Sequence, residues 1–120
     1  MRTRSGLWIA SYLRQGRLVP QRGRGLRAGA VRLAPGDVMD WHSTLAREEL
    51  LIVLRGWVSV EVQDSRARRH RSRLTAGECA WLPPQTRHRV LNRSLAEAAY
   101  IYVTAPVSRV RKNSWVTRDR

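Results

Sequence analysis

The sequence predicts an all-β fold, an antiparallel sandwich or barrel built as a single domain. Short alternating or apolar runs, separated by glycine, proline, asparagine or aspartate, recur through most of the chain, and long helical periodicity is hard to find. About ten short strands at this spacing are typical of sandwiches and barrels. With 120 residues, 42% of them hydrophobic, the chain can fill one core. We expect one domain over residues 1–120, with residues 1–6 and 107–120 peripheral or frayed.

Turn residues bound each predicted strand. The clearest expected strands span residues 7–13, 27–33, 38–42, 49–54, 57–63, 79–82, 86–91 and 100–104. We expect a loop at residues 43–47 and an exposed basic turn at residues 64–71. The short turn at Arg55 and Gly56 should join the flanking strands as a hairpin. Residues 45–51 would also suit a short helix, but the β-branched residues that follow favour a strand.

The charge is strongly basic, with 23 basic and 9 acidic residues and a formal net charge of +14. Such a field attracts phosphates and other anions. All basic residues except Lys112 are arginines, however, and they are spread along the whole chain apart from the run at residues 66–73. We therefore expect a solvated arginine-rich surface, and nucleic acid is the less favoured partner.

Cysteine content and hydropathy indicate the compartment. The single cysteine, Cys79, cannot form an intramolecular disulfide, so nothing indicates an oxidising compartment. No apolar stretch approaches the roughly 20 residues that span a bilayer. We expect a cytoplasmic protein with no membrane partner.

Two stretches, residues 36–56 and 77–92, have histidines and a carboxylate set between turn residues. The spaced positions of the first stretch are Gly36, His42, Thr44, Glu49 and Gly56. Those of the second stretch are Gly77, Pro83, Gln85, His88 and Asn92. We expect the chemistry of the protein to lie in these two stretches.

This spacing resembles the two signature motifs of the cupin superfamily, G(x)5HxH(x)3-4E(x)6G and G(x)5PxG(x)2H(x)3N. Eight of the ten defining positions match, the exceptions being Thr44 and Gln85. The resemblance implies a double-stranded β-helix, a jelly-roll-like barrel of two antiparallel sheets. Residues 57–76, between the motifs, have a suitable length for one hairpin.

The spacing also has a physical reading that needs no family name. His88 lies inside a predicted strand, Glu49 begins another, and His42 ends the strand before it. If these strands are neighbours with these faces inward, two imidazoles and one carboxylate converge in an apolar barrel mouth. An unpaired carboxylate there is costly, and a metal, a buried cation or protonation would relieve it.

We therefore expect a divalent transition metal on His42, Glu49 and His88. Two histidines and one carboxylate suit non-haem Fe(II), and also Mn, Zn, Ni or Cu. Metal-binding members of the family usually have a second histidine where this chain has Thr44, so the set is reduced to three. The alternative is that both histidines are core or rim residues whose ring nitrogens are hydrogen-bonded within a barrel that holds no metal. Glu48 would replace Glu49 if the register slipped, although the spacing to the motif glycine favours Glu49.

Four further residues are candidates for the pocket or its rim. Thr44 takes the place of a ligand, and Gln85 puts a side chain where the second motif has glycine. Trp41 flanks the first motif and could stack on a ligand or pack in the core. Tyr102 shares a strand face with Tyr100, so their hydroxyls would reach either a pocket or a dimer seam.

Three functions follow from these features. The first is a metal-binding cupin that binds, and oxidises or otherwise transforms, a small anionic or sugar-like molecule; oxygen-dependent oxidation fits the ligand set better than sugar isomerisation. The second is a non-catalytic ligand-binding or sensing module, favoured by the missing histidine and the lack of a clear general acid or base. The third and least favoured is a nucleic-acid-associated protein.

The expected assembly is a homodimer. Residues 49–54 are apolar on both faces after the first position, with Leu50, Ile52 and Leu54 on the second face. Strands of this kind are covered on both sides. The small members of the superfamily that the chain resembles also commonly pair through sheet edges.

Overall fold

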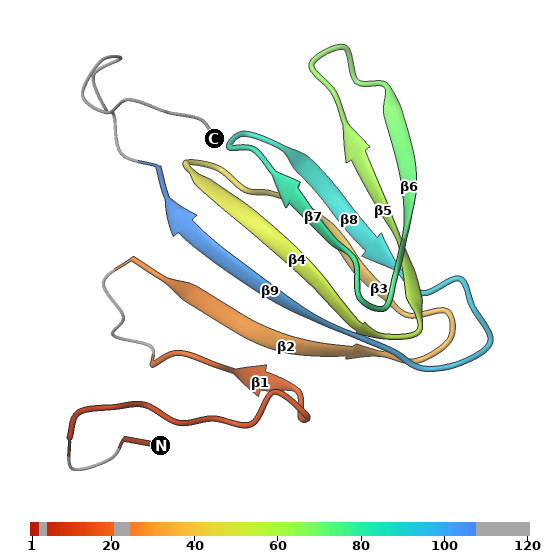
Figure 1. Ribbon diagram of the computed structural model, residues 1–120. Helices are drawn as coiled ribbons and strands as arrows, with labels where there is room; N and C mark the ends of the chain where they lie inside the picture. The colour runs from red at the N-terminus through yellow and green to blue at the C-terminus, as the bar shows by residue number, and fades with distance from the viewer. Residues whose placement is uncertain (3–4, 21–24, 108–120) are drawn as a thin grey trace.

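The computed structural model describes residues 1–2, 5–20 and 25–107 and arranges them in two antiparallel sheets (Figure 1). One sheet has five strands in the order β1-β2-β9-β4-β7, and the other has four in the order β3-β8-β5-β6. The strands are β1 (Gly16–Arg17), β2 (Arg27–Leu33), β3 (Val38–Ser43), β4 (Arg47–Arg55), β5 (Trp57–Gln63), β6 (Arg69–Thr75), β7 (Cys79–Leu82), β8 (Arg87–Leu91) and β9 (Ala98–Pro106). The expected all-β barrel is confirmed. No helix forms at residues 45–51, and no helix in the described part of the chain could cross a membrane.

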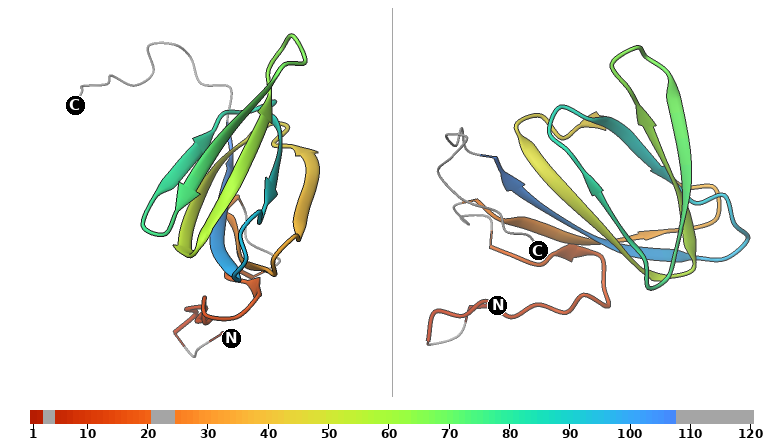
Figure 2. Two further views of the ribbon diagram at one scale, coloured as in Figure 1. Left: turned by 90° about the vertical axis from the view of Figure 1, so that its right-hand side faces the viewer. Right: turned by 45° about the horizontal axis from the view of Figure 1, so that its top comes forward.

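The core lies between the two sheets, which face each other as two layers (Figure 2). Every second residue of a strand points inward, and these positions are mostly aliphatic. The core comprises Val31, Leu33, Leu51, Val53, Val58, Val60, Leu74, Leu82, Val90, Ala98 and Tyr100. Each fully buried aliphatic side chain contributes roughly 1.5–3 kcal/mol, so this set holds the two layers together.

Three strands have the predicted bounds, and others begin or end differently. Strands β2, β5 and β7 match the expectation, whereas β4 starts at Arg47, inside the predicted loop. The predicted turn at residues 64–71 was too long, because β6 already begins at Arg69 and pairs with Gln63. The Asp64 carboxylate closes the shorter turn by accepting hydrogen bonds from the backbone of Arg66 and Arg68.

The strand predicted at residues 7–13 is wrong. Trp8 forms only an isolated bridge with Arg2, and the segment lies apart from the two sheets (Figure 1). Among the described residues its apolar side chains join no core, and Leu7, Ile9 and Leu13 are 57–67% exposed. Of the tail for which we expected a peripheral position, residues 108–120 lie outside the described residues.

The predicted hairpin at Arg55 and Gly56 is also wrong, because the two strands it joins belong to different sheets. The chain passes between layers at Gly56, whose φ of +69° favours glycine, and a Cβ there would lie 2.9 Å from the carbonyl oxygen of Glu97. Apolar residues on the two strands then face each other across the core. The hairpin expected from the length of residues 57–76 is confirmed, since β5 pairs with β6.

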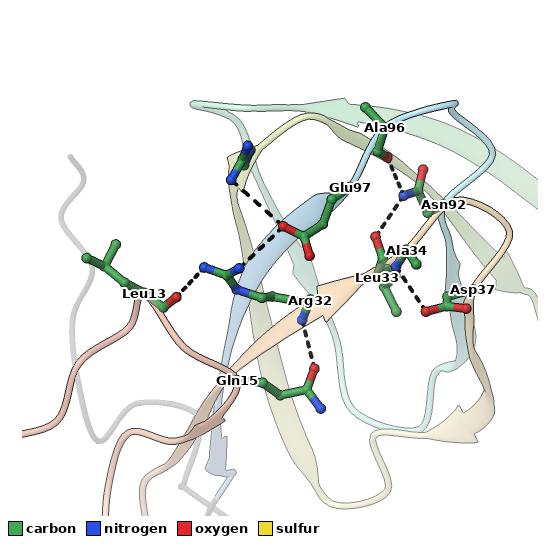
Figure 3. Close-up of polar contacts among 10 residues, drawn as sticks. Leu13, Gln15, Arg32, Leu33, Ala34, Asp37, Asn92, Ala96 and Glu97 are labelled. Carbon is green, nitrogen blue, oxygen red and sulfur yellow. Dashed lines mark hydrogen bonds and ion pairs between the residues drawn. The ribbon is translucent and has the colours of Figure 1, made fainter.

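Asn92, the last position of the second motif, has a structural role (Figure 3). Its buried amide nitrogen donates to the carbonyl oxygens of Leu33 and Ala96, at 2.9 and 2.8 Å. Its amide oxygen accepts from the backbone of Ser94, and its carbonyl accepts from the backbone of Gly36. Asn92 thereby ties the β2–β3 turn to the β8–β9 loop.

Arg32 attaches the N-terminal segment to the barrel (Figure 3). Its guanidinium donates to the carbonyl of Leu13 and lies 3.4 Å from the carboxylate of Glu97. The side chain of Gln15 accepts a hydrogen bond from the Arg32 backbone. With the short β1–β2 pairing, these contacts fix where the segment leaves the sheets.

Candidate metal centre

The structure brings His42, Glu49 and His88 together between the two sheets. His42 and His88 are register partners on β3 and β8, and their ring centroids are 4.2 Å apart. Glu49 faces them from β4 in the opposite sheet, so only two of the three strands are neighbours, unlike our expectation. One potential ligand atom from each residue lies within 4.8 Å of the others.

A register shift in β3 orients His42. The pairing with β8 slips between Met39 and His42, which is typical of a β-bulge, and bulges commonly redirect a side chain. Nδ1 of His42 lies 2.8 Å from the carbonyl oxygen of Asp40, two residues earlier. The ring is held by its own strand, while the histidine remains exposed at the mouth of the barrel.

The hydrogen bonds of the two rings leave their Nε2 atoms available as ligands. Nδ1 of His88 lies 3.1 Å from the carbonyl oxygen of Thr86, just as Nδ1 of His42 contacts that of Asp40. Because a carbonyl oxygen only accepts, each Nδ1 must carry the hydrogen and donate it. In the neutral ring, Nε2 then has a free lone pair, the tautomer that a metal requires.

The contact between His88 and Glu49 is unfavourable without a metal ion or a proton between the two groups. Nε2 of His88 is fully buried and lies 3.4 Å from Oε1 of Glu49, yet it has no hydrogen-bond partner. A bare ring nitrogen and a carboxylate oxygen are both acceptors, and burying them face to face is unfavourable. A metal ion between them, or a proton on either group, removes the conflict.

The spacing of the ligand atoms is close to what a metal needs. Ligands bonded at about 2.1 Å to one ion lie at most about 4.2 Å apart. Three ligands arranged tetrahedrally around one ion lie only about 3.4 Å apart, and the ligand atoms here lie within 4.8 Å of one another, so the side chains would have to close by about an ångström to bind one ion together. His42 is the exposed member and has room to move.

Thr44, which stands where the motif has a second histidine, joins two backbone segments. Its buried hydroxyl donates to the carbonyl oxygen of Pro83 at 2.8 Å and accepts from the backbone nitrogen of Thr86 at 2.9 Å. The hydroxyl thus fixes the Pro83–Thr86 turn that leads into His88. We assign it no ligand role.

A cavity of about 380 Å³ opens beside the three residues. Strand β9 supplies Tyr100, Tyr102 and Thr104 to its wall, and aliphatic surface comes from several other residues. Tyr102 fits because its register partner is Gly29, where a Cβ would lie 2.5 Å from the tyrosine ring. Burial, followed by the nearby charge of Glu49, raises the pKa of Tyr100 above its ordinary value, so this phenol stays protonated.

Two arginines lie at this cavity. The Arg47 guanidinium donates to the side chain of Thr104 at 2.8 Å and also to the carbonyl of Gly25. Burial and the neighbouring charge of Arg27 lower the pKa of Arg47 below its ordinary value, but it remains a cation at neutral pH. Neither arginine pairs with a carboxylate among the described residues, so the wall of the cavity is positively charged.

The predicted pocket residues divide into two groups. Thr44 and Tyr102 line the cavity, whereas Trp41 and Gln85 do not. Trp41 lies on the outer face of its sheet among arginines. Gln85 is exposed and has a φ of +58°, the left-handed conformation for which the motif has glycine.

The sequence reasoning missed the two cavity arginines and did not settle the position of Tyr100. Arg47 could have been found from the two-residue period of a strand, since it precedes Glu49 by two positions and therefore shares its face. Glu48 lies on the opposite face, where it accepts a hydrogen bond from the indole of Trp81 at 2.9 Å.

Comparison with known proteins gives the family. The sequence profile of the cupin domain family matches residues 29–104, well over half of the chain. The chain therefore belongs to the cupin domain family. A search of curated proteins found no significant match.

Solved cupin structures share the fold. An oxalate oxidase is 22% identical, with a TM-score of 0.64 over 68% of this chain and 42% of that chain. The cupin domain of Schizosaccharomyces pombe Cnp3 is 16% identical, with a TM-score of 0.66 over 78% of this chain and 64% of that one. The Drosophila melanogaster CENP-C cupin domain is 16% identical, with a TM-score of 0.63 over 74% of this chain and 64% of that one. The chain spans less than two thirds of each, and identities this low support the fold alone.

Proposed function

We propose that this cupin domain binds a divalent transition metal through His42, Glu49 and His88. The main support is the buried Nε2 of His88, which faces a carboxylate oxygen at 3.4 Å and has no hydrogen-bond partner. A metal held by two histidines and one carboxylate, whether Fe, Mn, Zn, Ni or Cu, offers open positions for substrate or O2 and Lewis-acid or redox chemistry. The barrel itself orients the two rings through their Nδ1 hydrogen bonds.

The molecule bound beside the metal is, in our proposal, a small organic anion. Arg27 and Arg47 supply positive charge to a cavity of about 380 Å³, and the protonated Tyr100 and the hydroxyl of Tyr102 supply donors. Arginine recognises carboxylates through charge-assisted hydrogen bonds. The aliphatic wall would exclude water from the rest of the ligand.

Metal content tests the first proposal. We expect the protein, purified without chelator and reconstituted with Fe(II), Mn(II) or Zn(II), to hold about one metal equivalent by elemental analysis. Glu49→Gln and His88→Ala should each lower occupancy at least tenfold, since each removes a ligand. His70→Ala is the matched control, because His70 is exposed and pairs with Asp64 away from the cavity.

The competing state is a protonated His88 paired with an ionised Glu49. In that case the wild type would hold less than about a tenth of an equivalent of every metal after reconstitution, and the metal proposal would fail. Equal loss in all three variants would show instead that the metal binds elsewhere.

Anion binding is tested separately with oxalate and glycolate as probes, because glycolate occupies a solved oxalate oxidase as a substrate analogue. We expect the metal-loaded wild type to bind one of them by calorimetry, and Arg27→Gln to weaken this binding about tenfold. Arg93→Gln changes an exposed arginine of the β8–β9 loop and should leave the binding unchanged. No binding of either probe would contradict the anion assignment and leave the metal result standing.

A non-catalytic binding or sensing module is the second candidate. It is favoured because Tyr100 stays protonated, and because apart from the proposed ligands no other lining residue is a carboxylate or imidazole suited to act as a general base. Oxygen consumption with the bound probe separates the two: uptake above the metal-free protein indicates an oxidase, and binding without uptake indicates the module.

We also propose that the protein is a cytoplasmic homodimer. The outward residues of β4 and β9, among them Leu50, Ile52, Ile101 and Val103, form an apolar face of the five-stranded sheet that is only half-buried. A second copy would cover it. The free, exposed Cys79 is consistent with a reducing compartment.

A further inference from the structure

The outer face of the four-stranded sheet gathers arginines from two separate stretches of the sequence. Alternate residues of β6 and β8 point away from the core, and these positions are Arg69, Arg71, Arg73, Arg87 and Arg89. The spread of arginines along the chain argued against nucleic acid, yet folding places these five on one surface. We call this surface, with Trp41 and Trp57, the basic face.

Only part of the positive charge on the basic face is neutralised. The buried carboxylate of Glu61 accepts hydrogen bonds from Arg71 and Arg89, at 2.9 and 2.7 Å. Burial alone would raise the pKa of Glu61, but these two arginines lower it below its ordinary value, so the carboxylate stays charged. Arg69, Arg73 and Arg87 have no carboxylate partner in the part of the chain that the structure describes.

The arginines of the basic face surround its two tryptophans. The Arg73 guanidinium lies 3.8 Å from the centroid of the Trp57 ring. Around Trp41, the guanidinium carbons of Arg89, Arg69 and Arg87 lie at 5.0, 5.2 and 5.8 Å. Planar cationic groups and aromatic rings thus alternate across one sheet surface. Both groups can stack on nucleobases.

We propose that the basic face binds single-stranded nucleic acid. The guanidiniums of Arg69, Arg73 and Arg87 contact phosphates, and bases stack on the tryptophans and on the guanidinium planes. Alternate residues of a strand lie about 7 Å apart, which gives β6 a row of cations along an extended backbone. Stacking on tryptophan rings and guanidinium planes is open only to unpaired bases, so a single strand is the favoured occupant.

This site is separate from the metal centre. His88 and Val90 point into the core, whereas Arg87 and Arg89 of the same strand point outward. The two faces of one sheet can therefore hold different ligands, and the nucleic-acid proposal does not depend on the metal proposal.

The experiment measures fluorescence anisotropy of a labelled 12-nucleotide single strand titrated with the full chain at 50–200 mM salt. We expect Arg69→Gln/Arg73→Gln/Arg87→Gln to weaken binding at least tenfold at physiological salt. Its slope of log affinity against log salt should fall by about 2, since each phosphate contact contributes roughly 0.7 for single strands. The control Arg14→Gln/Arg17→Gln/Arg93→Gln removes the same charge from exposed sites outside the face and should keep the slope.

Two further probes test the role of the bases. An abasic strand of equal length should bind about tenfold more weakly, because each stacked base contributes to affinity. Equal loss in both triple variants would show a general charge effect and overturn the proposal. Equal affinity for the abasic strand, or tighter binding of a duplex, would overturn it as well. Circular dichroism and thermal unfolding of the variants verify that the barrel is intact.

Discussion

Thr44 marks the largest departure from the motifs, and its contacts explain how a barrel tolerates it. The hydroxyl both donates and accepts, joining the carbonyl of Pro83 to the backbone nitrogen of Thr86. Nδ1 of His88 lies 3.1 Å from the carbonyl of Thr86. The residue that replaces a ligand therefore acts on a proposed ligand indirectly, through the backbone that holds it.

Removing this hydroxyl should destabilise the fold. Thr44→Val leaves the carbonyl of Pro83 and the amide of Thr86 without their partner, and a buried unsatisfied group costs about 1–3 kcal/mol. Thr44→Ser keeps the hydroxyl and loses one methyl group, worth at most about 0.8 kcal/mol. In urea unfolding, the free energy of unfolding should therefore be highest for the wild type, lower for Thr44→Ser and lowest for Thr44→Val. Equal stability of the Val variant would mean that water satisfies both groups.

At the scale of the elements, the passage from β4 to β5 determines the architecture. Gly56 turns the chain from one sheet into the other, and Glu49 and His88 consequently face each other from opposite layers. A true hairpin at this point would have put the two strands side by side in one sheet.

Two alanine substitutions, one at Gly56 in this passage and one at Gly36 in the β2–β3 turn, separate the cost of backbone strain from that of steric conflict. Gly36 and Gly56 both have positive φ, +86° and +69°, but only at Gly56 would a Cβ meet other atoms, 2.9 Å from the carbonyl oxygen of Glu97. Gly36→Ala should cost roughly 1–2 kcal/mol, the usual penalty for alanine in this conformation. Gly56→Ala should cost more in the same unfolding assay. Equal losses would show that the backbone at Glu97 moves aside.

The sequence could predict those strands whose pattern of apolar and polar residues fits only a strand. In β5, valines at positions 58, 60 and 62 alternate with other residue types, so its bounds were predicted correctly, although residues 58–61 are all buried. β6 resembles a turn because Arg69, Arg71 and Arg73 are outward residues of a strand at the sheet edge. The sheet to which β5 belongs could not be predicted, because a two-residue connection suits a hairpin and a passage between layers equally well.

The same distinction applies to the candidate site. Motif spacing identified His42, Glu49 and His88, which the structure brings within 4.8 Å. Motif spacing could not indicate that the bare Nε2 of His88 faces the carboxylate of Glu49. The orientation of the rings depends on hydrogen bonds to the backbone carbonyls of Asp40 and Thr86. Trp41, by contrast, could have been placed, because it directly precedes His42 and therefore points to the outer face when His42 points inward.

For the whole molecule, the distribution of charge makes the two outer surfaces different. The formal net charge is +14, and like charges oppose the association of two copies through the basic face. The outward residues of β4 and β9 are largely uncharged, and on the adjacent β7 the side chain of Trp81 is 59% exposed. A homodimer through the five-stranded sheet would bury this tryptophan and direct both basic faces to solvent.

One lysine on each outer surface tests this arrangement. Val103 lies on the apolar face, and Val38 is an exposed valine of the other sheet. We expect the wild type to have twice the 13.8 kDa mass of one chain by light scattering at micromolar concentration. Val103→Lys should give the single-chain mass, because a lysine there would be desolvated within the interface. Val38→Lys adds the same charge and should remain dimeric. A wild type with the single-chain mass at every concentration would disprove the dimer, and a dimeric Val103→Lys would place the interface elsewhere.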